Sequence, residues 1–239
     1  MKLLVRGSAF ALLSTATIAK PVPIASQSGI YTNEEETYFD DLAKRPTAPW
    51  ISVNAENNGK TIKLSAIDAF QKPLVDSATL WTLAPIGHSE DRLRLFLPDG
   101  RTTELRRARP VSCWVAIRKD KPKADGSEDW YFARDVKLHD QGGRAIVGGG
   151  EDTGAQPVMI RMRNVTWDKG STNAPVVALY IHKPENWDKA EAYSWAAPDS
   201  ARVGINLRWV QTGCAIEGLG TASKLSTDTF KTNEEAKAK

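Results

Sequence analysis

The sequence predicts an all-β fold: an antiparallel β-sandwich or jelly roll with one short N-terminal helix. Two observations lead to this class. Apolar and polar residues alternate with a period of two in many short segments from residue 50 to residue 213, and clusters of Gly, Pro, Asn and Asp separate these segments. Strand-like and helix-like segments do not alternate, so a parallel α/β sheet is not expected. The pattern instead indicates roughly ten short strands in stacked sheets.

The single helix is expected over residues 32–45. Asn33 can cap it, glutamates fill its first turn, and Lys44 and Arg45 fill its last turn, a charge order that complements the helix dipole. One apolar stripe is formed by Tyr38, Phe39 and Leu42. An amphipathic helix uses such a stripe to pack against its neighbours.

Two segments near the C-terminus form the expected centre of the sandwich. Val176–Ile181 is apolar at both its odd and its even positions, which indicates a strand covered on both faces. Val203–Trp209 alternates strictly, which indicates a strand with one face in water. Between them lies a tryptophan-rich connection, residues 185–200, in which Asn186 or Asp188 is expected to cap a short helix.

This short helix would place Trp187, Glu191 and Trp195 on one face, because they are spaced at i, i+4 and i+8. Tyr193 lies in the same connection. Exposed indole rings beside carboxylates and amides would form a platform on which sugars stack, whereas buried rings would plug one end of the sandwich. Both alternatives remain open at this point.

Six arginines fall in a predicted hairpin whose turn is Pro98-Asp99-Gly100. The expected register places Arg94 opposite Glu104 and Arg92 opposite Arg106. One face then carries three arginines and one glutamate. Guanidinium groups pair bidentately with carboxylates, sulfates and phosphates, so this face is a candidate site for an acidic polymer. The alternative is a solvated strand face with local ion pairs.

The two cysteines, Cys113 and Cys214, are expected to form one disulfide. An even number of cysteines favours a bond in an oxidising compartment. The bond would close a loop of about 100 residues and stabilise the fold by roughly 4–5 kcal/mol in the chain-entropy model. Two buried free thiols are the alternative. Neither cysteine has the spacing of a metal or redox motif.

The N-terminal residues predict export. Lys2 and Arg6 precede a modestly apolar stretch, and small residues up to Ala19 suit a signal peptidase. The stretch is too short and too rich in Ser and Thr to span a membrane, so a periplasmic or extracellular location is expected. An uncleaved N-terminus and an organelle transit peptide are alternatives. The expected organisation is a signal peptide (residues 1–19), a linker (20–31), a single β-sandwich domain (32–220) and a flexible tail (221–239).

Charge and motifs narrow the class of partner. The chain has 32 Lys and Arg against 29 Asp and Glu, a net charge of +3, so nucleic acid is not an expected partner. Walker loops, dinucleotide-binding glycine motifs and nucleophile elbows are missing from the sequence, so no cofactor is expected. The histidines lack the spacing of metal ligands. His139 and His182 are the candidate general bases if the protein is an enzyme.

A short stretch, Thr103–Arg106, is similar to part of the Arg-Ser/Thr-Glu-Leu-Arg motif of jelly-roll alginate lyases. The resemblance covers about five residues, and the family's Gln-Ile/Val-His motif has no counterpart in this chain. It implies a lyase-like enzyme that acts on an anionic glycan. No complete catalytic motif supports that activity, so an enzyme remains an alternative.

These features together predict an exported binding or structural module for a glycan or for a partner protein at the cell surface. The alternatives are a carbohydrate-active, lyase-like enzyme and a jelly-roll assembly subunit. The candidate ligand-binding residues are Arg92, Arg94, Arg106, Trp187, Tyr193 and Trp195.

Overall fold

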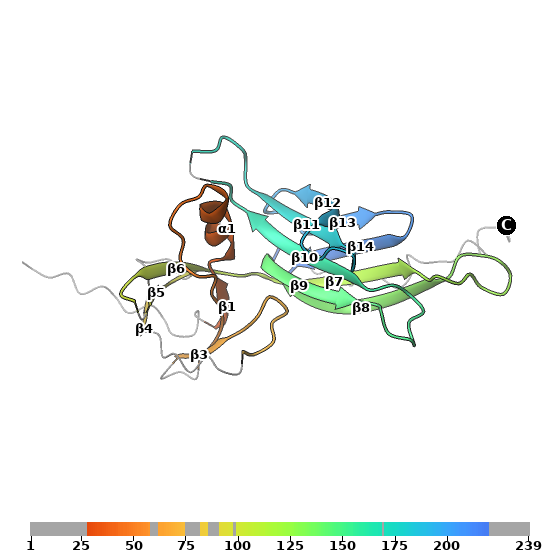
Figure 1. Cartoon of the computed structure of the whole chain (residues 1–239), viewed down its shortest axis with the longest axis horizontal. Coiled ribbons are helices and arrows are strands. Elements are labelled where there is room, and N and C mark those ends of the chain that lie inside the picture. Colours follow the sequence, from red (N-terminus) through yellow and green to blue (C-terminus); the bar gives the residue numbers. More distant parts are fainter. Residues whose placement is uncertain are drawn as a thin grey trace, which may run out of the picture.

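The computed structural model describes residues 28–57, 62–74, 82–85, 91–97, 99–168 and 170–219. These residues form fourteen strands and one helix in three antiparallel sheets, which confirms the predicted all-β class with a short helix (Figure 1). The expected signal peptide and C-terminal tail lie outside the described residues, as do residues 20–27 of the expected linker.

The N-terminal sheet has six strands in the order β3-β2-β1-β6-β5-β4. The helix α1 (Glu34–Leu42) follows its first strand directly. The strands are β1 (Gly29–Thr32), β2 (Ser52–Asn57), β3 (Ile62–Ala66), β4 (Thr82–Pro85), β5 (Arg92–Phe96) and β6 (Thr102–Arg107). The strand β1 begins at Gly29, within residues 20–31 of the expected linker.

The C-terminal sandwich is built from eight strands in two four-stranded sheets. We call β12-β11-β10-β9 the helix-side sheet and β13-β14-β7-β8 the disulfide sheet. The strands are β7 (Pro110–Arg118), β8 (Trp130–His139), β9 (Gln141–Val147), β10 (Val158–Val165), β11 (Val176–His182), β12 (Ala190–Ala196), β13 (Arg202–Asn206) and β14 (Val210–Ile216).

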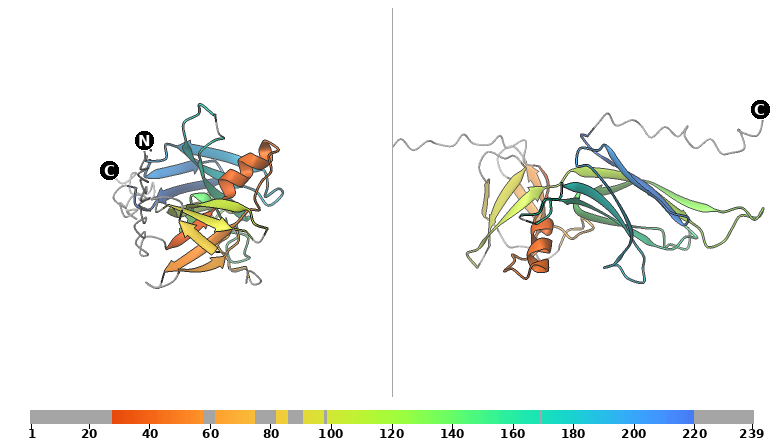
Figure 2. Two further views of the ribbon diagram at one scale, coloured as in Figure 1. Left: turned by 90° about the vertical axis from the view of Figure 1, so that its left-hand side faces the viewer. Right: turned by 90° about the horizontal axis from the view of Figure 1, so that it is seen from above.

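The described residues contain two hydrophobic cores within the range of the single expected domain, residues 32–220. The larger core lies between the two sheets of the sandwich and contains Ile160, Met162, Leu179 and Ile181. The smaller core belongs to the N-terminal sheet and is centred on Tyr31. The two parts lie end to end, with α1 at their boundary (Figure 2). Sequence periodicity detects strands but does not tell which core each strand joins, so the two cores become visible only in the structure.

The predicted helix is confirmed as α1, but it packs in an unexpected way. Tyr38 and Leu42 of the expected apolar stripe are exposed, and the buried residue of the helix is Glu35. Asn33 does not cap the helix through its side chain. Its amide donates to the Pro49 carbonyl and its Oδ1 accepts from the Ile51 N–H, so it ties the helix start to the N-terminal sheet.

The predicted arginine hairpin is confirmed as β5 and β6. Arg94 pairs with Glu104, and Arg92 pairs with Arg106, in the expected register. The turn fixes this register because Gly100 adopts a positive φ of 81° that favours glycine. Buried leucines occupy the opposite face.

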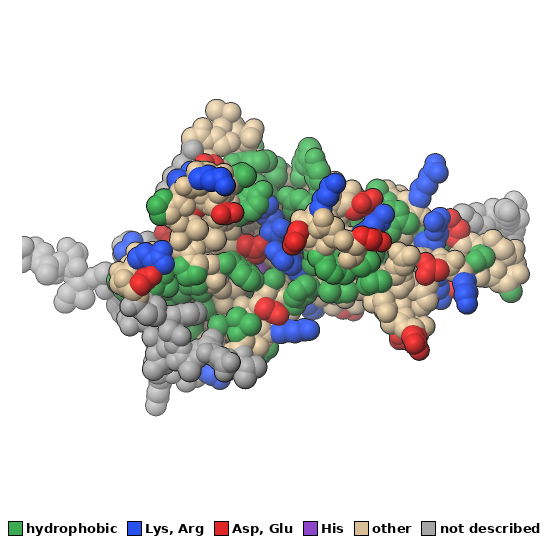
Figure 3. All heavy atoms as spheres, in the orientation of Figure 1, with side chains coloured by type: hydrophobic (Ala, Val, Ile, Leu, Met, Phe, Trp, Pro, Cys, Tyr) green, Lys and Arg blue, Asp and Glu red, His purple; other side chains and the backbone are tan. Residues whose placement is uncertain are grey.

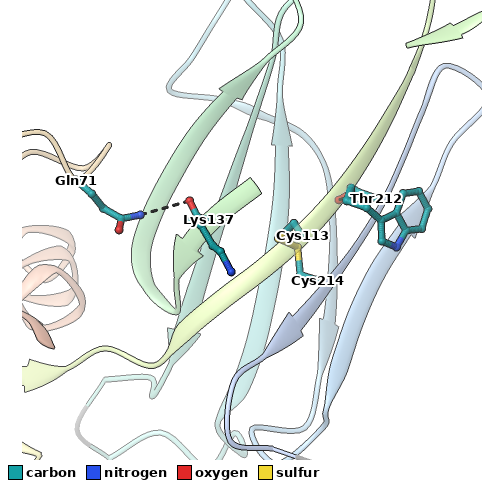
Figure 4. The surroundings of a disulfide bond; sticks show 6 residues. Gln71, Cys113, Lys137, Thr212 and Cys214 are labelled. Atoms are coloured by element: carbon teal, nitrogen blue, oxygen red, sulfur yellow. Dashed lines mark hydrogen bonds between the residues drawn. A yellow bond between two sulfur atoms is a disulfide. The ribbon is translucent and has the colours of Figure 1, made fainter. Parts of the chain in front are cut away.

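The predicted disulfide is also confirmed. Cys113 of β7 and Cys214 of β14 lie directly opposite each other in the disulfide sheet and are bonded (Figure 4). The bond therefore joins neighbouring strands of one sheet and does not join the two sheets. Near it, the Gln71 side chain donates to the Lys137 carbonyl at 3.4 Å, which links the N-terminal part to β8 (Figure 4).

The expected short helix between residues 185 and 200 is wrong. Ala190–Ala196 forms β12, the edge strand of the helix-side sheet, and pairs with β11. Tyr193 and Trp195 therefore project from a strand, and Trp187 lies in the turn before it. Within the described ranges, no helix is long and apolar enough to cross a membrane.

Candidate functional site

The strongest candidate site lies on the outer face of the helix-side sheet. Side chains alternate along β11, so Leu179 and Ile181 enter the core while Tyr180 between them points outward. Tyr180 pairs with Tyr193 of β12, and Trp195 follows two residues later on the same face. We call Tyr180, Tyr193 and Trp195 the aromatic platform.

The three rings of the aromatic platform form a continuous row. The ring centroids of Tyr193 and Trp195 are 5.6 Å apart with an interplanar angle of 26°, a stacked arrangement. The centroids of Tyr180 and Tyr193 are 6.0 Å apart with an angle of 39°. Tyr193 is 60% exposed and Trp195 is 62% exposed. The rings therefore rest on one another; Tyr180 is half-buried, while most of the surface of Tyr193 and Trp195 remains open to water.

The helix α1 covers the other half of this sheet face through buried ion pairs. Arg163 of β10 donates through Nε and Nη2 to Glu35 Oε2 at 3.1 and 2.7 Å. Its guanidinium carbon also lies 4.2 Å from the ring centroid of Tyr38. Since Arg163 pairs with Ala178, which pairs with Trp195, the helix lies beside the aromatic platform.

A second set of charges extends this contact towards β9. Glu34 of α1 accepts from Arg161 and lies 3.5 Å from Nη2 of Arg144. A Cβ atom at Gly142 would lie 1.6 Å from Glu34 Oε2, and Gly142 has a φ of 88°. Glycine is therefore required where the carboxylate approaches the start of β9. In Figure 3, blue and red side chains meet at this boundary between the two parts.

Burial governs the protonation of these charged groups. It raises the pKa of Glu35, and the charge of Arg163 opposes the rise. It lowers the pKa of Arg161, and Glu34 opposes that change. Each ion pair therefore favours the charged form of both partners and so opposes the effect of burial.

The predicted arginine face is assembled on the N-terminal sheet. Arg92 and Arg94 are exposed, and Arg106 is half-buried. Arg92 forms an ion pair with Glu104, the one acidic residue expected on this face. Arg106 donates to the Thr166 hydroxyl at 3.2 Å, a contact with the sandwich that the sequence did not predict.

The structure does not unite the predicted arginine and aromatic residues in one site. The arginines lie on β5 and β6, whereas Tyr193 and Trp195 lie on β12, and among the described residues no hydrogen bond, ion pair or ring contact joins the two groups. Trp187 is half-buried in the turn before β12 and is not part of the row. Tyr180 is not among the predicted residues, because it lies within an unbroken apolar run that indicates a buried strand.

Neither candidate histidine is placed to act as a general base. His139 is 3% exposed, its Nδ1 accepts from the Gln141 N–H, and burial lowers its pKa to about 4. His182 is equally buried, and burial together with Arg161 and Arg144 lowers its pKa. A general base that acts on a polysaccharide must reach its substrate at the protein surface, so these buried positions do not favour the lyase alternative.

Within the described part of the chain, no group of three or more His, Cys, Asp or Glu side chains is arranged to hold a metal ion. Comparison of the chain with protein-family models, curated proteins and solved structures gave no match.

Proposed function

We propose that the protein is an exported binding module that holds a glycan on its aromatic platform. The observation that carries this proposal is the exposure of Tyr193 and Trp195, which is about 60% for each ring. A large aromatic ring contributes most to stability when it is buried. Two neighbouring rings left open on a regular sheet are therefore better explained by a ligand than by packing.

The chemistry of the row suits sugars. A pyranose ring presents axial C–H groups on one face, and these groups pack favourably against the electron-rich face of an aromatic ring. Three rings spaced 5.6 and 6.0 Å apart offer a linear surface about two to three sugar units long. Because β11 and β12 hold the rings, the surface is formed before the ligand arrives, which reduces the entropic cost of binding.

Polar groups suitable for sugar hydroxyls lie beside the row. Glu191 is two residues before Tyr193 on β12, and its carboxylate lies 3.3 Å from the Lys183 ammonium group. Both side chains are partly exposed. Such groups can exchange hydrogen bonds with hydroxyls and so fix the orientation of a sugar that stacking alone would leave free to slide.

The disulfide supports the export part of the proposal. Bonds such as Cys113–Cys214 persist in oxidising compartments and are rare in reducing ones. N-terminal sequencing of the mature protein tests this point independently of ligand binding. A mature chain that begins close to Lys20 is expected, whereas a chain that retains Met1 would contradict cleavage.

A glycan array followed by calorimetry tests the binding proposal. The wild-type chain is expected to bind at least one oligosaccharide, and Trp195→Ala is expected to weaken that binding about tenfold, because one stacking ring contributes roughly 1–1.5 kcal/mol. Tyr193→Ala is expected to act in the same direction. Circular dichroism should show an unchanged fold for both variants, since neither ring is buried.

Phe132→Ala is the matched control. Phe132 is an exposed aromatic residue on the outer face of the opposite sheet, where it stacks on Trp114. Its loss should leave glycan binding unchanged. A wild-type chain that binds no glycan, or an equal loss of binding in the Phe132 and Trp195 variants, would contradict the proposal.

A further inference from the structure

A cleft that is separate from the aromatic platform lies where the N-terminal sheet meets the sandwich. Its volume is about 600 Å³. Four arginines and two aspartates line it, together with the amide side chains of Gln141 and Asn164. We call it the arginine cleft; its charged residues are Asp91, Arg92, Arg106, Arg107, Arg109 and Asp140.

Arg109 is anchored at the base of the arginine cleft. Its N–H and Nε donate to the two carboxylate oxygens of Asp140, which is 1% exposed in its side chain, at 2.7 and 2.6 Å. Its Nη1 donates to the Pro198 carbonyl at 2.8 Å. Its Nη2 is buried and has no acceptor among the described residues. One donor of an otherwise fixed guanidinium therefore remains to be satisfied.

Two more arginines have carboxylate partners of unequal quality. Arg92 forms an ion pair with Glu104. Arg107 lies 3.9 Å from Asp91, whose side chain is 76% exposed, so water screens this pair. The Arg107 Nη2 also donates to the Ser28 carbonyl at 2.9 Å.

Arg106 is the arginine of the cleft without a carboxylate partner among the described residues. Its side-chain hydrogen bond within the described ranges goes to the neutral hydroxyl of Thr166. It also lies directly opposite Arg92 in the strand pair. Like charges at directly opposed positions repel each other, so an anion between these two guanidinium groups would relieve the repulsion.

We propose that the arginine cleft binds an oxyanion, namely a carboxylate, sulfate or phosphate group, with Arg106 as its principal ligand. Guanidinium groups match the paired oxygens of these anions through two parallel hydrogen bonds. The amides of Gln141 and Asn164, which make no hydrogen bond through their side chains to other described residues, supply neutral donors at the same cleft. The proposal does not depend on the glycan site.

Calorimetric titration with sodium sulfate, sodium phosphate and sodium galacturonate at low ionic strength tests the proposal. The wild-type chain is expected to bind at least one of these anions, with affinity falling as salt is added. Arg106→Ala is expected to weaken binding at least tenfold. Sulfate and phosphate cannot stack on an aromatic ring, so Trp195→Ala should leave the binding of these two ions unchanged, which separates this cleft from the aromatic platform.

Arg94→Ala is the matched control. Arg94 lies on the same hairpin face as Arg106 and has the same charge, but it does not line the arginine cleft. Less than a twofold loss of affinity is expected. An equal loss in the Arg94 and Arg106 variants would show that the anions respond to net charge alone, and this result would overturn the proposal.

Asn164→Asp provides a second test that leaves every arginine in place. The added carboxylate would occupy the cleft as an internal anion and should abolish binding even if Arg106→Ala fails to fold. Binding of the free ions assigns the site to small oxyanions. Binding to oligogalacturonate or heparin oligosaccharide without binding to the free ions assigns it to acidic groups on a polymer. No binding to any of these probes would overturn the proposal.

Discussion

The two outer faces of the sandwich both carry aromatic side chains, but they use them differently. On the disulfide sheet, Trp114 lies over Gly213, where a Cβ atom would come within 2.6 Å of the indole Nε1. Trp114 also stacks on Phe132, with ring centroids 5.8 Å apart. On the helix-side sheet, Tyr193 and Trp195 cover each other but remain about 60% exposed.

This difference separates an aromatic ring that fills a structural gap from one that is available to a ligand. Trp114 occupies the space that the missing side chain of Gly213 leaves, and so it protects the backbone of β14. Trp195 lies opposite Ala178 on an edge strand and is not part of the hydrophobic core. The two sheets should therefore respond differently to the loss of an aromatic ring.

Removal of the disulfide should most strongly weaken the disulfide sheet. The Cys113→Ser/Cys214→Ser variant loses a bond that spans 101 residues, so we expect the free energy of unfolding to fall by about 4 kcal/mol. Urea unfolding followed by circular dichroism measures the change. An unchanged midpoint would mean that the sheet does not depend on its covalent bond.

The helix-side sheet should depend instead on its buried ion pair. Arg163→Ala leaves the Glu35 carboxylate buried without its partner, so a loss of about 3 kcal/mol in unfolding free energy is expected. Arg45→Ala is the control, because Arg45 forms exposed ion pairs with Asp40 and Asp168 that water screens, so its loss should hardly change the free energy of unfolding. Equal effects in the two variants would contradict a special role for the buried pair.

Mild acid should destabilise the sandwich through its buried histidines. The pKa of His139 is about 4 in the folded chain and about 6.5 when unfolded, so the unfolded chain binds more protons between these values. Stability is therefore lost as the pH falls from 6.5 towards 4, by up to about 3 kcal/mol. His182 acts in the same direction.

Urea titrations at pH 7 and pH 4.5 measure this dependence. His139→Gln should reduce the difference between the two pH values, because glutamine can accept the Gln141 N–H without taking up a proton. A variant whose pH dependence equals that of the wild type would show that His139 titrates normally in the folded protein.

The smallest effects should come from single aromatic residues and should differ between the faces. Trp114→Ala uncovers Gly213 and is expected to cost about 2 kcal/mol, whereas Trp195→Ala should change stability by less than about 0.5 kcal/mol. In the Trp114→Ala background, Gly213→Ala should be tolerated, since the clashing ring is gone. Thermal unfolding of the four proteins tests the set, and an equal cost for the two tryptophans would remove the contrast.

The sequence carried enough information for the local features of the fold. The register of β5 and β6 follows from the turn that contains Gly100, and the disulfide follows from two cysteines in alternating strands. The sequence pattern of β12 is also typical of a strand, because Glu191, Tyr193 and Trp195 alternate with small residues. The spacing of its tryptophans also fits a helix, and this second period led to the wrong prediction.

The association of the two parts could not be predicted in the same way. Glu35 is separated from Arg163 by 128 positions, and each residue alone resembles an ordinary surface charge. Burial of a carboxylate becomes favourable only when a distant guanidinium is already in place. Similarly, Arg107 and Arg109 gain their place in the arginine cleft from the sandwich, which supplies Asp140 and Asn164.

The junction between β6 and β7 has a mechanical consequence. Only Ala108 and Arg109 separate these strands; Ala108 donates its N–H to the Ile30 carbonyl, and Asp140 holds Arg109. Because this connection is short and hydrogen-bonded at both residues, it should be rigid and should not act as a hinge between the two parts. The distance between the two sides of the arginine cleft should therefore stay constant when a ligand binds. The small-angle X-ray scattering profile should then be the same with and without bound anion.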